Sequence, residues 1–258
     1  MGYKTIRVEK SDGIEKIILN IPEKLNALDL VMREELKEEF ANIGTDEDVR
    51  VVVMTGAGKA FCSGGDIKTM GDVSTPKGRD RLKNVQKLIK LMVELEKPII
   101  SGVNGAATGA GFHMALASDI IIASEKAKFA ESFVKIGLIP DMGGLYFLPL
   151  RVGVHKAKEL MFTGRMILAD EAASLGIVNK TVPHEQLDEE VMQLARSLAE
   201  GPGRSYAMIK SALNNFPASL QTMLEIEANL QAVSFSTKDF KEGYQAFVEK
   251  RKPVFTGE

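Results

Sequence analysis

The chain has 258 residues, of which 33 are Lys or Arg, 35 are Asp or Glu and 45% are hydrophobic. This balance is typical of a folded globular protein, and the length fits one large domain or one domain with a helical appendage. A formal net charge of −2 provides no global positive field for nucleic-acid binding. The single cysteine, Cys62, excludes an intramolecular disulfide and a CxxC zinc site, and the three histidines are scattered. We therefore expect neither a metal nor a redox cofactor.

The N-terminal segment alternates polar and apolar residues and lacks the apolar stretch of a signal peptide. Nowhere do 18 consecutive apolar residues occur, so the sequence predicts no membrane-spanning helix. We expect a soluble, cytoplasmic protein.

In chain order, the first half predicts strands separated by helices and glycine-rich turns. Asp29 is the expected N-cap of the first helix. The continuous apolar run at 50–55 suits a strand that is buried on both faces. The expected elements are strands at 5–9 and 14–20 around a turn at 11–13, a helix at 29–43, a strand at 50–55, a glycine-rich turn at 56–65 and a helix at 79–96.

The pattern then repeats before the chain becomes helical. The repeat predicts a strand at 98–103, a short helix at 109–117 and a strand at 119–123. The later helices are expected near 186–200, 203–215, 217–235 and 238–250. Alternating strands and helices indicate an α/β fold, with a core at 1–200 and a C-terminal helical region at 201–258.

Two glycine-rich turns carry the chemical signal: FCSGGDIK at 61–68 and NGAATGAGFHMALASD at 104–119. Small residues let a ligand approach the backbone, and the unpaired N–H groups at a helix start suit a phosphate or an oxyanion. The stretch 109–115 also fits the dinucleotide fingerprint GxGxxG/A, but a lone match is weak evidence. Five residues separate its first glycine from the strand, whereas a dinucleotide turn is tight.

These turns, followed by ASDIIIASEKAKFA, IGLIPDMGG and LMFTGRMILADEAASLGIVNKTV, resemble the enoyl-CoA hydratase/isomerase (crotonase) superfamily over about residues 5–255. The resemblance implies a spiral of repeated ββα units, a C-terminal helical trimerisation region and an acyl-CoA thioester substrate. It places two oxyanion-binding backbone N–H groups at Gly65 and Ala110. The coenzyme A and substrate contacts that it implies are Lys24, Leu25, Ala27, Gly64, Asp66, Ile67, Lys68 and Gly109.

The superfamily's hydratases use two glutamates, and neither is present at its motif position here. The first position holds His113 and the second holds Phe133, while Glu131 lies two residues before the second. These three residues are candidates for pocket or auxiliary roles. We expect His113 to pack or to form a local hydrogen bond rather than to move protons.

Asp141, in GLIPDMGG, is the candidate catalytic residue. The superfamily uses this position in some isomerases, and the segment resembles the ring-opening and double-bond isomerases of phenylacetyl-CoA degradation. One carboxylate suffices for a 1,3-proton shift, because it can remove a proton from one carbon and return it to another. The alternative role for Asp141 is to cap the helix that follows.

The sequence thus predicts an enoyl-CoA isomerase, with an enoyl-CoA hydratase as the alternative. An aryl-CoA dehalogenase is less expected, because the substrate pocket of those enzymes carries a tryptophan and this chain has none. A non-catalytic coenzyme A- or RNA-binding protein is the remaining alternative. Lys83, Lys87 and Lys90 share a helix face but have no interleaved aromatic residues, so a solvated face is expected. By resemblance we expect a trimer or hexamer.

Overall fold

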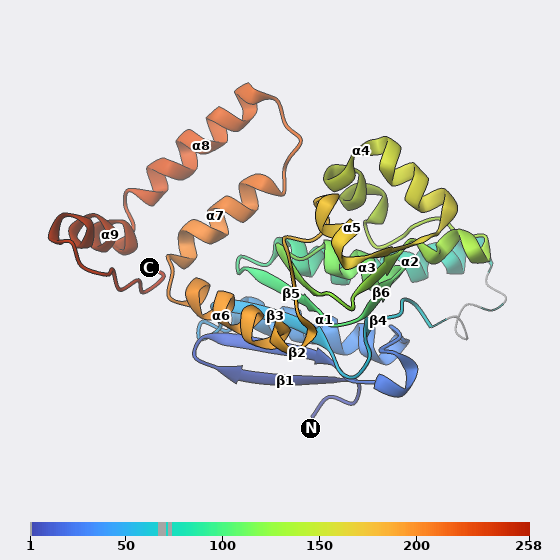
Figure 1. The fold of residues 1–258 in the computed structure, drawn as a ribbon. Helices are drawn as coiled ribbons and strands as arrows, with labels where there is room; N and C mark the ends of the chain where they lie inside the picture. Colours follow the sequence, from blue (N-terminus) through green and yellow to red (C-terminus); the bar gives the residue numbers. More distant parts are fainter. Residues whose placement is uncertain (1, 67–70, 72–73) are drawn as a thin grey trace.

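The structure is a computed structural model that describes residues 2–66, 71 and 74–258. Over these residues the strands form two sheets (Figure 1). The larger sheet has the order β1 (Ile6–Ser11), β2 (Ile14–Leu19), β3 (Val51–Gly56), β5 (Ile99–Val103), β7 (Ile120–Ser124) and β10 (Lys180–Val182). The smaller sheet has the order β4 (Ala60–Cys62), β6 (Ala106–Thr108), β8 (Lys128–Ala130) and β9 (Met166–Leu168).

Both sheets are mostly parallel, because helices connect the strands of successive units. The pairs β1–β2 and β8–β9 are antiparallel, and the other paired neighbours are parallel. The helices are α1 (Leu30–Thr45), α2 (Thr75–Glu94), α3 (Ala110–Leu116), α4 (Gly144–Thr163), α5 (Ala169–Ser174), α6 (Leu187–Ala199), α7 (Gly203–Leu213), α8 (Leu220–Ser234) and α9 (Lys238–Glu249).

A strand–strand–helix unit repeats along the described chain. In each unit the first strand joins the larger sheet and the second joins the smaller one: β3 and β4, then β5 and β6, then β7 and β8. Helices α2 and α3 follow the first two units, and the 3₁₀ turn η3 (Ser132–Ile136) precedes α4 after the third. This is the spiral of ββα units that the resemblance implied, so the predicted fold is confirmed.

The central strands are buried on both faces. In β3, Val52 and Met54 belong to the core that contains residues of α1 and α2. Val51 and Val53 point to the opposite face and pack in a second cluster with α6. The apolar run at 50–55 therefore forms the doubly covered strand that its composition predicts.

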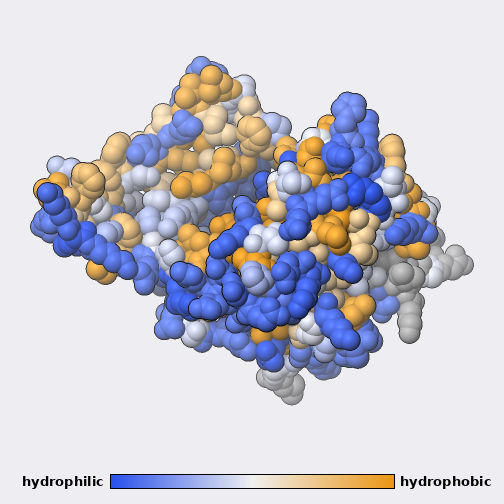
Figure 2. Space-filling view, viewed as in Figure 1, coloured by the Kyte–Doolittle hydropathy of each residue, from blue (hydrophilic) through white to orange (hydrophobic). Residues whose placement is uncertain are grey.

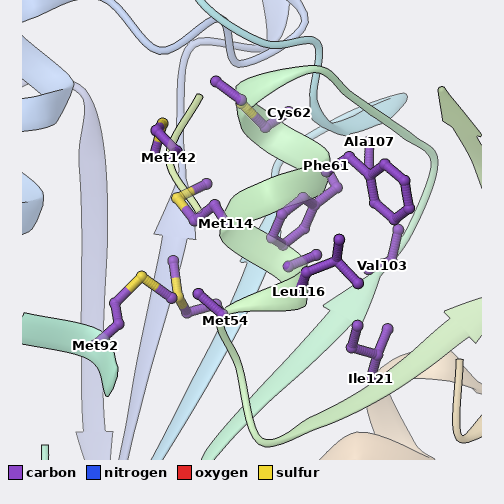
Figure 3. Close-up of a cluster of buried hydrophobic side chains, with 14 of the residues drawn as sticks. Met54, Phe61, Cys62, Met92, Val103, Ala107, Met114, Leu116, Ile121 and Met142 are labelled. Carbon is purple, nitrogen blue, oxygen red and sulfur yellow. The ribbon is translucent and has the colours of Figure 1, made fainter. Parts of the chain in front are cut away.

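Helix α3 lies inside the protein, and all seven of its residues are buried. Its apolar side chains share a cluster with residues of β3, β4 and β5 (Figure 3). Met142 belongs to the same cluster and is 1% exposed, although its φ of 43° is uncommon for a residue with a side chain. Burial of Met142 fixes the loop that joins η3 to α4.

The last three helices project from the body of the protein (Figure 1). Every residue of α8 is at least partly exposed, and Leu220 and Phe247 are 76% and 85% exposed. Apolar side chains gather over this projecting region (Figure 2). The division at residue 200 stays a prediction. Among the described residues, no helix combines the length and apolar character that crossing a membrane requires.

Most expected elements are present, with differences at their ends. Asp29 caps α1, and its Oδ1 accepts the Met32 N–H at 2.9 Å. Helix α2 begins at Thr75 rather than at 79, because its first turn is polar and carries Pro76, a residue that helix starts tolerate. The strands of the smaller sheet were not predicted. A strand of three residues is too short to show the alternation of polar and apolar residues by which a strand is predicted from sequence.

A pair of buried carboxylates joins β2 to α1. Glu15 is 4% exposed, and its buried Oε1 has no hydrogen-bond partner among the described residues, while Glu39 is 7% exposed and accepts the Tyr3 O–H at 2.6 Å. Burial, followed by the effect of the neighbouring Glu39 carboxylate, raises the pKa of Glu15 to about 8.

This pair predicts a pH-dependent stability. An unfolded Glu15 would lose its proton near its ordinary value of 4.5, whereas the folded one keeps it to about pH 8. The folded state binds more protons over this interval, so the free energy of unfolding falls as the pH rises through it. Glu15→Gln keeps a hydrogen-bond donor but cannot ionise. We expect the melting temperature of Glu15→Gln, relative to that of the wild type, to increase steadily from pH 5 to pH 9. Exposed Glu9→Gln serves as the control, and equal pH slopes in wild type and Glu15→Gln would contradict the assignment.

Candidate active site

The turn after β4 and the start of α3 lie against each other. Thr108 Oγ1 donates to the Ser63 carbonyl oxygen at 2.8 Å and ties the two turns together. A Cβ placed on Gly64 would lie 2.8 Å from the Thr108 oxygen and 3.7 Å from the Ala110 nitrogen. Gly64 also has a φ of +102°, which side chains rarely allow. The glycine thus brings the 64–65 turn close to the first amide of α3.

A segment before α1 supports this turn from its other side. The Leu28 N–H donates to the Gly64 carbonyl at 2.7 Å, and Leu28 forms an isolated bridge with Gly65. Arg33, which is 5% exposed on α1, donates from Nε to the Leu28 carbonyl at 3.1 Å. Sequence reasoning missed this role of Arg33. Its only sequence signal is a basic residue on the otherwise apolar face of a predicted helix.

The predicted coenzyme A contacts fall around the two turns. Leu25 lies beside the first turn, where its carbonyl accepts the Ser63 N–H at 3.0 Å, and its side chain is 46% exposed. Lys24 and Ala27 flank Leu25 on the same segment, while Gly64 and Gly109 lie within the turns and Asp66 follows the first one. The predicted contacts Ile67 and Lys68 lie outside the described residues.

Glycines also let α3 begin against β4. Gly109 is the N-cap with φ 52° and ψ −123°, a combination suited to glycine. A Cβ on Gly111 would lie 2.2 Å from the Cys62 carbonyl oxygen. The first amides of a helix have no acceptor within it, and in α3 the His113 N–H is the one that bonds to the Gly109 carbonyl. The Ala110 N–H therefore lies before the first hydrogen bond within the helix.

The two auxiliary candidates His113 and Glu131 form a buried pair. Nε2 of His113 lies 2.9 Å from each carboxylate oxygen of Glu131, and their side chains are 0% and 1% exposed. The Phe133 ring stacks on the imidazole with an interplanar angle of 9° and a centroid distance of 5.1 Å. The structure thus joins all three auxiliary candidates. The sequence did not predict the hydrogen bond between them.

Asp141 lies in the loop that Met142 anchors. Its backbone oxygen accepts the Gly144 N–H at 2.8 Å. The N-cap of α4 is Gly143, and no side chain caps this helix start, so the capping alternative for the Asp141 side chain is wrong. Oδ1 of Asp141 is buried and has no hydrogen-bond partner within the described part of the chain. A buried polar atom without a partner is uncommon in folded proteins.

Burial dominates the electrostatics of Asp141. It raises the pKa of the carboxyl above its ordinary value, against the lowering effects of His113 and Arg33. Glu131 adds a further raising effect, and Arg81 a further lowering one. The result is a carboxylate that holds a proton more tightly than a solvated aspartate, and this is a property of a usable general base.

Cys62 lies next to these groups but has the character of an apolar side chain. It is fully buried, and this burial raises the pKa of its thiol to about 11. Thiolate chemistry at neutral pH is therefore not available to it. Among the residues that the structure describes, no three His, Cys, Asp or Glu side chains gather in a way that would hold a metal ion.

Comparisons with known proteins give consistent results over nearly the whole chain. The model of the family described as enoyl-CoA hydratase/isomerase matches residues 9–258. The chain is 38% identical to a probable enoyl-CoA hydratase of Rhodobacter capsulatus, over the whole of both chains. It is 37% identical to the 1,2-epoxyphenylacetyl-CoA isomerase of Escherichia coli, over 100% of this chain and 99% of that protein. The crystal structure of an enoyl-CoA hydratase from Bacillus anthracis has a TM-score of 0.94 at 35% identity and covers 99% of this chain and 100% of its own.

Gly144 offers a test of how the site is packed. A Cβ at this position would lie 2.1 Å from Nε2 of His113, so Gly144→Ala must displace the imidazole from Glu131. We expect a loss of about 1–3 kcal/mol in the free energy of unfolding, the usual range for overpacking, together with reduced activity. Gly44→Ala is the matched control, because no atom lies within 4 Å of its added Cβ. Thermal unfolding of both variants checks this, and equal stabilities would contradict it.

Proposed function

Because the chain belongs to the enoyl-CoA hydratase/isomerase family, we propose that it is an enoyl-CoA isomerase in which Asp141 moves a proton between two carbons of an acyl-CoA thioester. The observation that carries this proposal is the half-buried Asp141 carboxyl, whose buried Oδ1 lacks a partner among the described residues. The neighbouring carboxylate, Glu131, is already bonded to His113. Of these two carboxylates, Asp141 is therefore the one that is available to act as a base.

In this proposal the backbone activates the thioester. The N–H groups of Gly65 and Ala110 would both donate to the thioester carbonyl oxygen and stabilise the negative charge that develops there. The closeness of the two turns supports this pairing, since a Cβ added to Gly64 would lie 3.7 Å from the Ala110 nitrogen. Backbone donors on fixed turns need little reorganisation during the reaction, and loss of one such donor typically costs about 10²–10³ in rate.

The proton transfer needs no second acid. Ionised Asp141 removes a proton from one carbon next to the double-bond system, and the electron pair passes into the thioester enolate held by the two amides. Asp141 then returns the same proton to the carbon two positions away. The double bond has moved, the enolate has collapsed, and the carboxylate is regenerated.

A hydratase is the alternative, and the name of the Rhodobacter capsulatus relative favours it. In that case His113 and Asp141 would hold a water molecule that adds across a 2-enoyl thioester. Panels of 2-enoyl, 3-enoyl and cyclic enoyl-CoA esters in heavy water separate the two reactions. An isomerase gives a shifted double bond with or without deuterium at the receiving carbon, whereas a hydratase gives a hydroxyacyl product.

The assembly of the chain is a second part of the proposal. The exposed apolar residues of the projecting helices, among them Leu224 and Phe235, are 48% and 54% exposed in one chain. Closed symmetry would cover them in every copy. We expect light scattering to give three or six times the mass of the chain at micromolar concentration. A monomer would contradict this prediction.

Asp141→Asn tests the base directly. The amide keeps the shape of the side chain but cannot accept the proton, so we expect turnover to fall by about 10² or more, while binding of acyl-CoA esters persists. In the wild type, kcat/KM should fall as the pH drops through the raised pKa of Asp141, because protonation removes the base.

Two further variants complete this test. We expect His113→Gln to be far milder at a pH where Asp141 is ionised, and Asp170→Asn, at an exposed position in the first turn of α5, to keep wild-type turnover. Near-normal activity in Asp141→Asn, or a collapse in His113→Gln alone, would reverse the assignment.

A further inference from the structure

Arg33 is a charged side chain that the mechanism above does not use, although the fold buries it. It is 5% exposed, and this burial lowers the pKa of its guanidinium group. Burying a charged group is unfavourable unless hydrogen bonds replace those to water. Within the part of the chain that the structure describes, the guanidinium forms one hydrogen bond, from Nε to the Leu28 carbonyl oxygen at 3.1 Å. A function of this side chain should therefore be sought at Leu28.

Leu28 lies directly against the turn that carries the first proposed oxyanion donor. Its N–H donates to the Gly64 carbonyl oxygen at 2.7 Å, and it forms a parallel bridge with Gly65. The residue is 0% exposed. Leu28 thus contacts the turn through its N–H and Arg33 through its carbonyl.

The Gly64 carbonyl and the Gly65 N–H belong to the same peptide group. This group is trans and planar, so its carbonyl and its N–H point in opposite directions. A hydrogen bond that holds the carbonyl oxygen on one side therefore fixes the direction of the N–H on the other. The same bond polarises the peptide group and strengthens its N–H as a donor. A displacement of Leu28 would disturb both the direction and the strength of the Gly65 N–H.

The turn needs such support because it consists of two glycines. Neither Gly64 nor Gly65 has a side chain that could pack, and glycine has more backbone freedom than any other residue. The neighbouring Ser63 N–H donates to the Leu25 carbonyl at 3.0 Å, but this bond holds the preceding residue. Among the described residues, the bond from Leu28 is the one backbone hydrogen bond to the peptide group between the two glycines.

We propose that Arg33 is a positioning residue, which acts through Leu28 to aim the Gly65 N–H at the thioester carbonyl oxygen. Nε of Arg33 holds the Leu28 carbonyl, Leu28 holds the Gly64 carbonyl, and the opposite side of that peptide group presents the donor. Arg33 does not contact the substrate. The inference rests on the proposed function in one respect, because Gly65 must be one of the two amides that bind the thioester oxygen.

Three substitutions separate the hydrogen-bond donor of Arg33 from its charge. Arg33→Gln removes the charge but keeps a donor, because Nε2 of glutamine is as many bonds from Cα as Nε of arginine. Arg33→Met places a methyl group at that position, and Arg33→Lys keeps the charge but has a carbon there. In Arg33→Met we expect kcat to fall by about tenfold or more with KM nearly unchanged, because a misdirected donor weakens binding of the transition state. Arg33→Gln should restore most of this rate.

Arg196→Met, at an exposed position of α6, is the matched control and should keep the wild-type rate. A lower melting temperature of Arg33→Met with unchanged kcat would indicate a structural role and overturn the proposal. A rise in KM alone, the sign of direct substrate contact, would also overturn it. Full activity in Arg33→Lys would do the same, because the charge would then suffice. If Arg33→Met does not fold, the comparison of Arg33→Lys with Arg33→Gln decides.

A measurement without turnover separates this proposal from the proposed function. The probe is butanoyl-CoA with ¹³C in its thioester carbonyl, a saturated ester that has no double bond to shift or hydrate. Its carbonyl infrared band moves to lower frequency when the oxygen accepts hydrogen bonds. We expect the band of the bound ester to be lowered in the wild type and in Arg33→Gln, and to move back toward that of the free ester in Arg33→Met.

The two ways in which this measurement can fail have different meanings. A wild-type band at the position of the free ester would contradict the pair of amides in the proposed function, and the role of Arg33 with it. A lowered wild-type band that stays unchanged in Arg33→Met would overturn the role of Arg33 alone.

Discussion

The contact between two backbone turns is the constraint on which the site depends. Gly64 and Gly111 each lie where an added Cβ would meet a backbone carbonyl oxygen, at 2.8 Å and 2.2 Å. Backbone atoms cannot move aside as the end of a flexible side chain can. The parallel pairing of β4 with β6 sets this approach, and the repeated ββα unit in turn places those strands side by side. The fold therefore brings the two glycine-rich turns together through close backbone contacts.

The burial of α3 accounts for two features of the site, the pairing of His113 with Glu131 and the raised pKa of Asp141. A helix that lies wholly in the core places His113 away from water, so the imidazole needs a partner from another element, and Glu131 supplies it. The same low-polarity surroundings raise the pKa of Asp141. One physical cause thus produces both a fixed hydrogen-bonded pair and an aspartate with increased basicity. The difference between the two carboxylates is that Glu131 has a donor and Oδ1 of Asp141 has none among the described residues.

Local signals in the sequence predicted the parts of this arrangement that depend on local chemistry. The apolar run at 50–55, the Asp29 cap and the glycine-rich turns are visible in short windows, because each reflects the backbone or burial of a few neighbouring residues. The partnership of His113 with Glu131 spans 18 positions and three elements, so no window contains it. Arg33 was missed for a different reason. Its contact with Leu28 is local, five positions along the chain, but a charged side chain at the start of a helix is normally expected to face solvent, whereas here it is buried.

The choice between moving a proton and adding water depends on how many free acid–base groups face the substrate. Hydration must deliver a hydroxyl to one carbon and a proton to its neighbour, a task that the family's hydratases divide between two glutamates. Here one of those positions is an imidazole already bonded to Glu131, and the other is the ring of Phe133 that stacks on it. A stacked phenyl ring offers no hydrogen bond to a water molecule, and it covers the face of the imidazole as well. In the proposed mechanism Asp141 therefore acts alone, and a single base that retains its proton suits a 1,3-shift better than an addition of water.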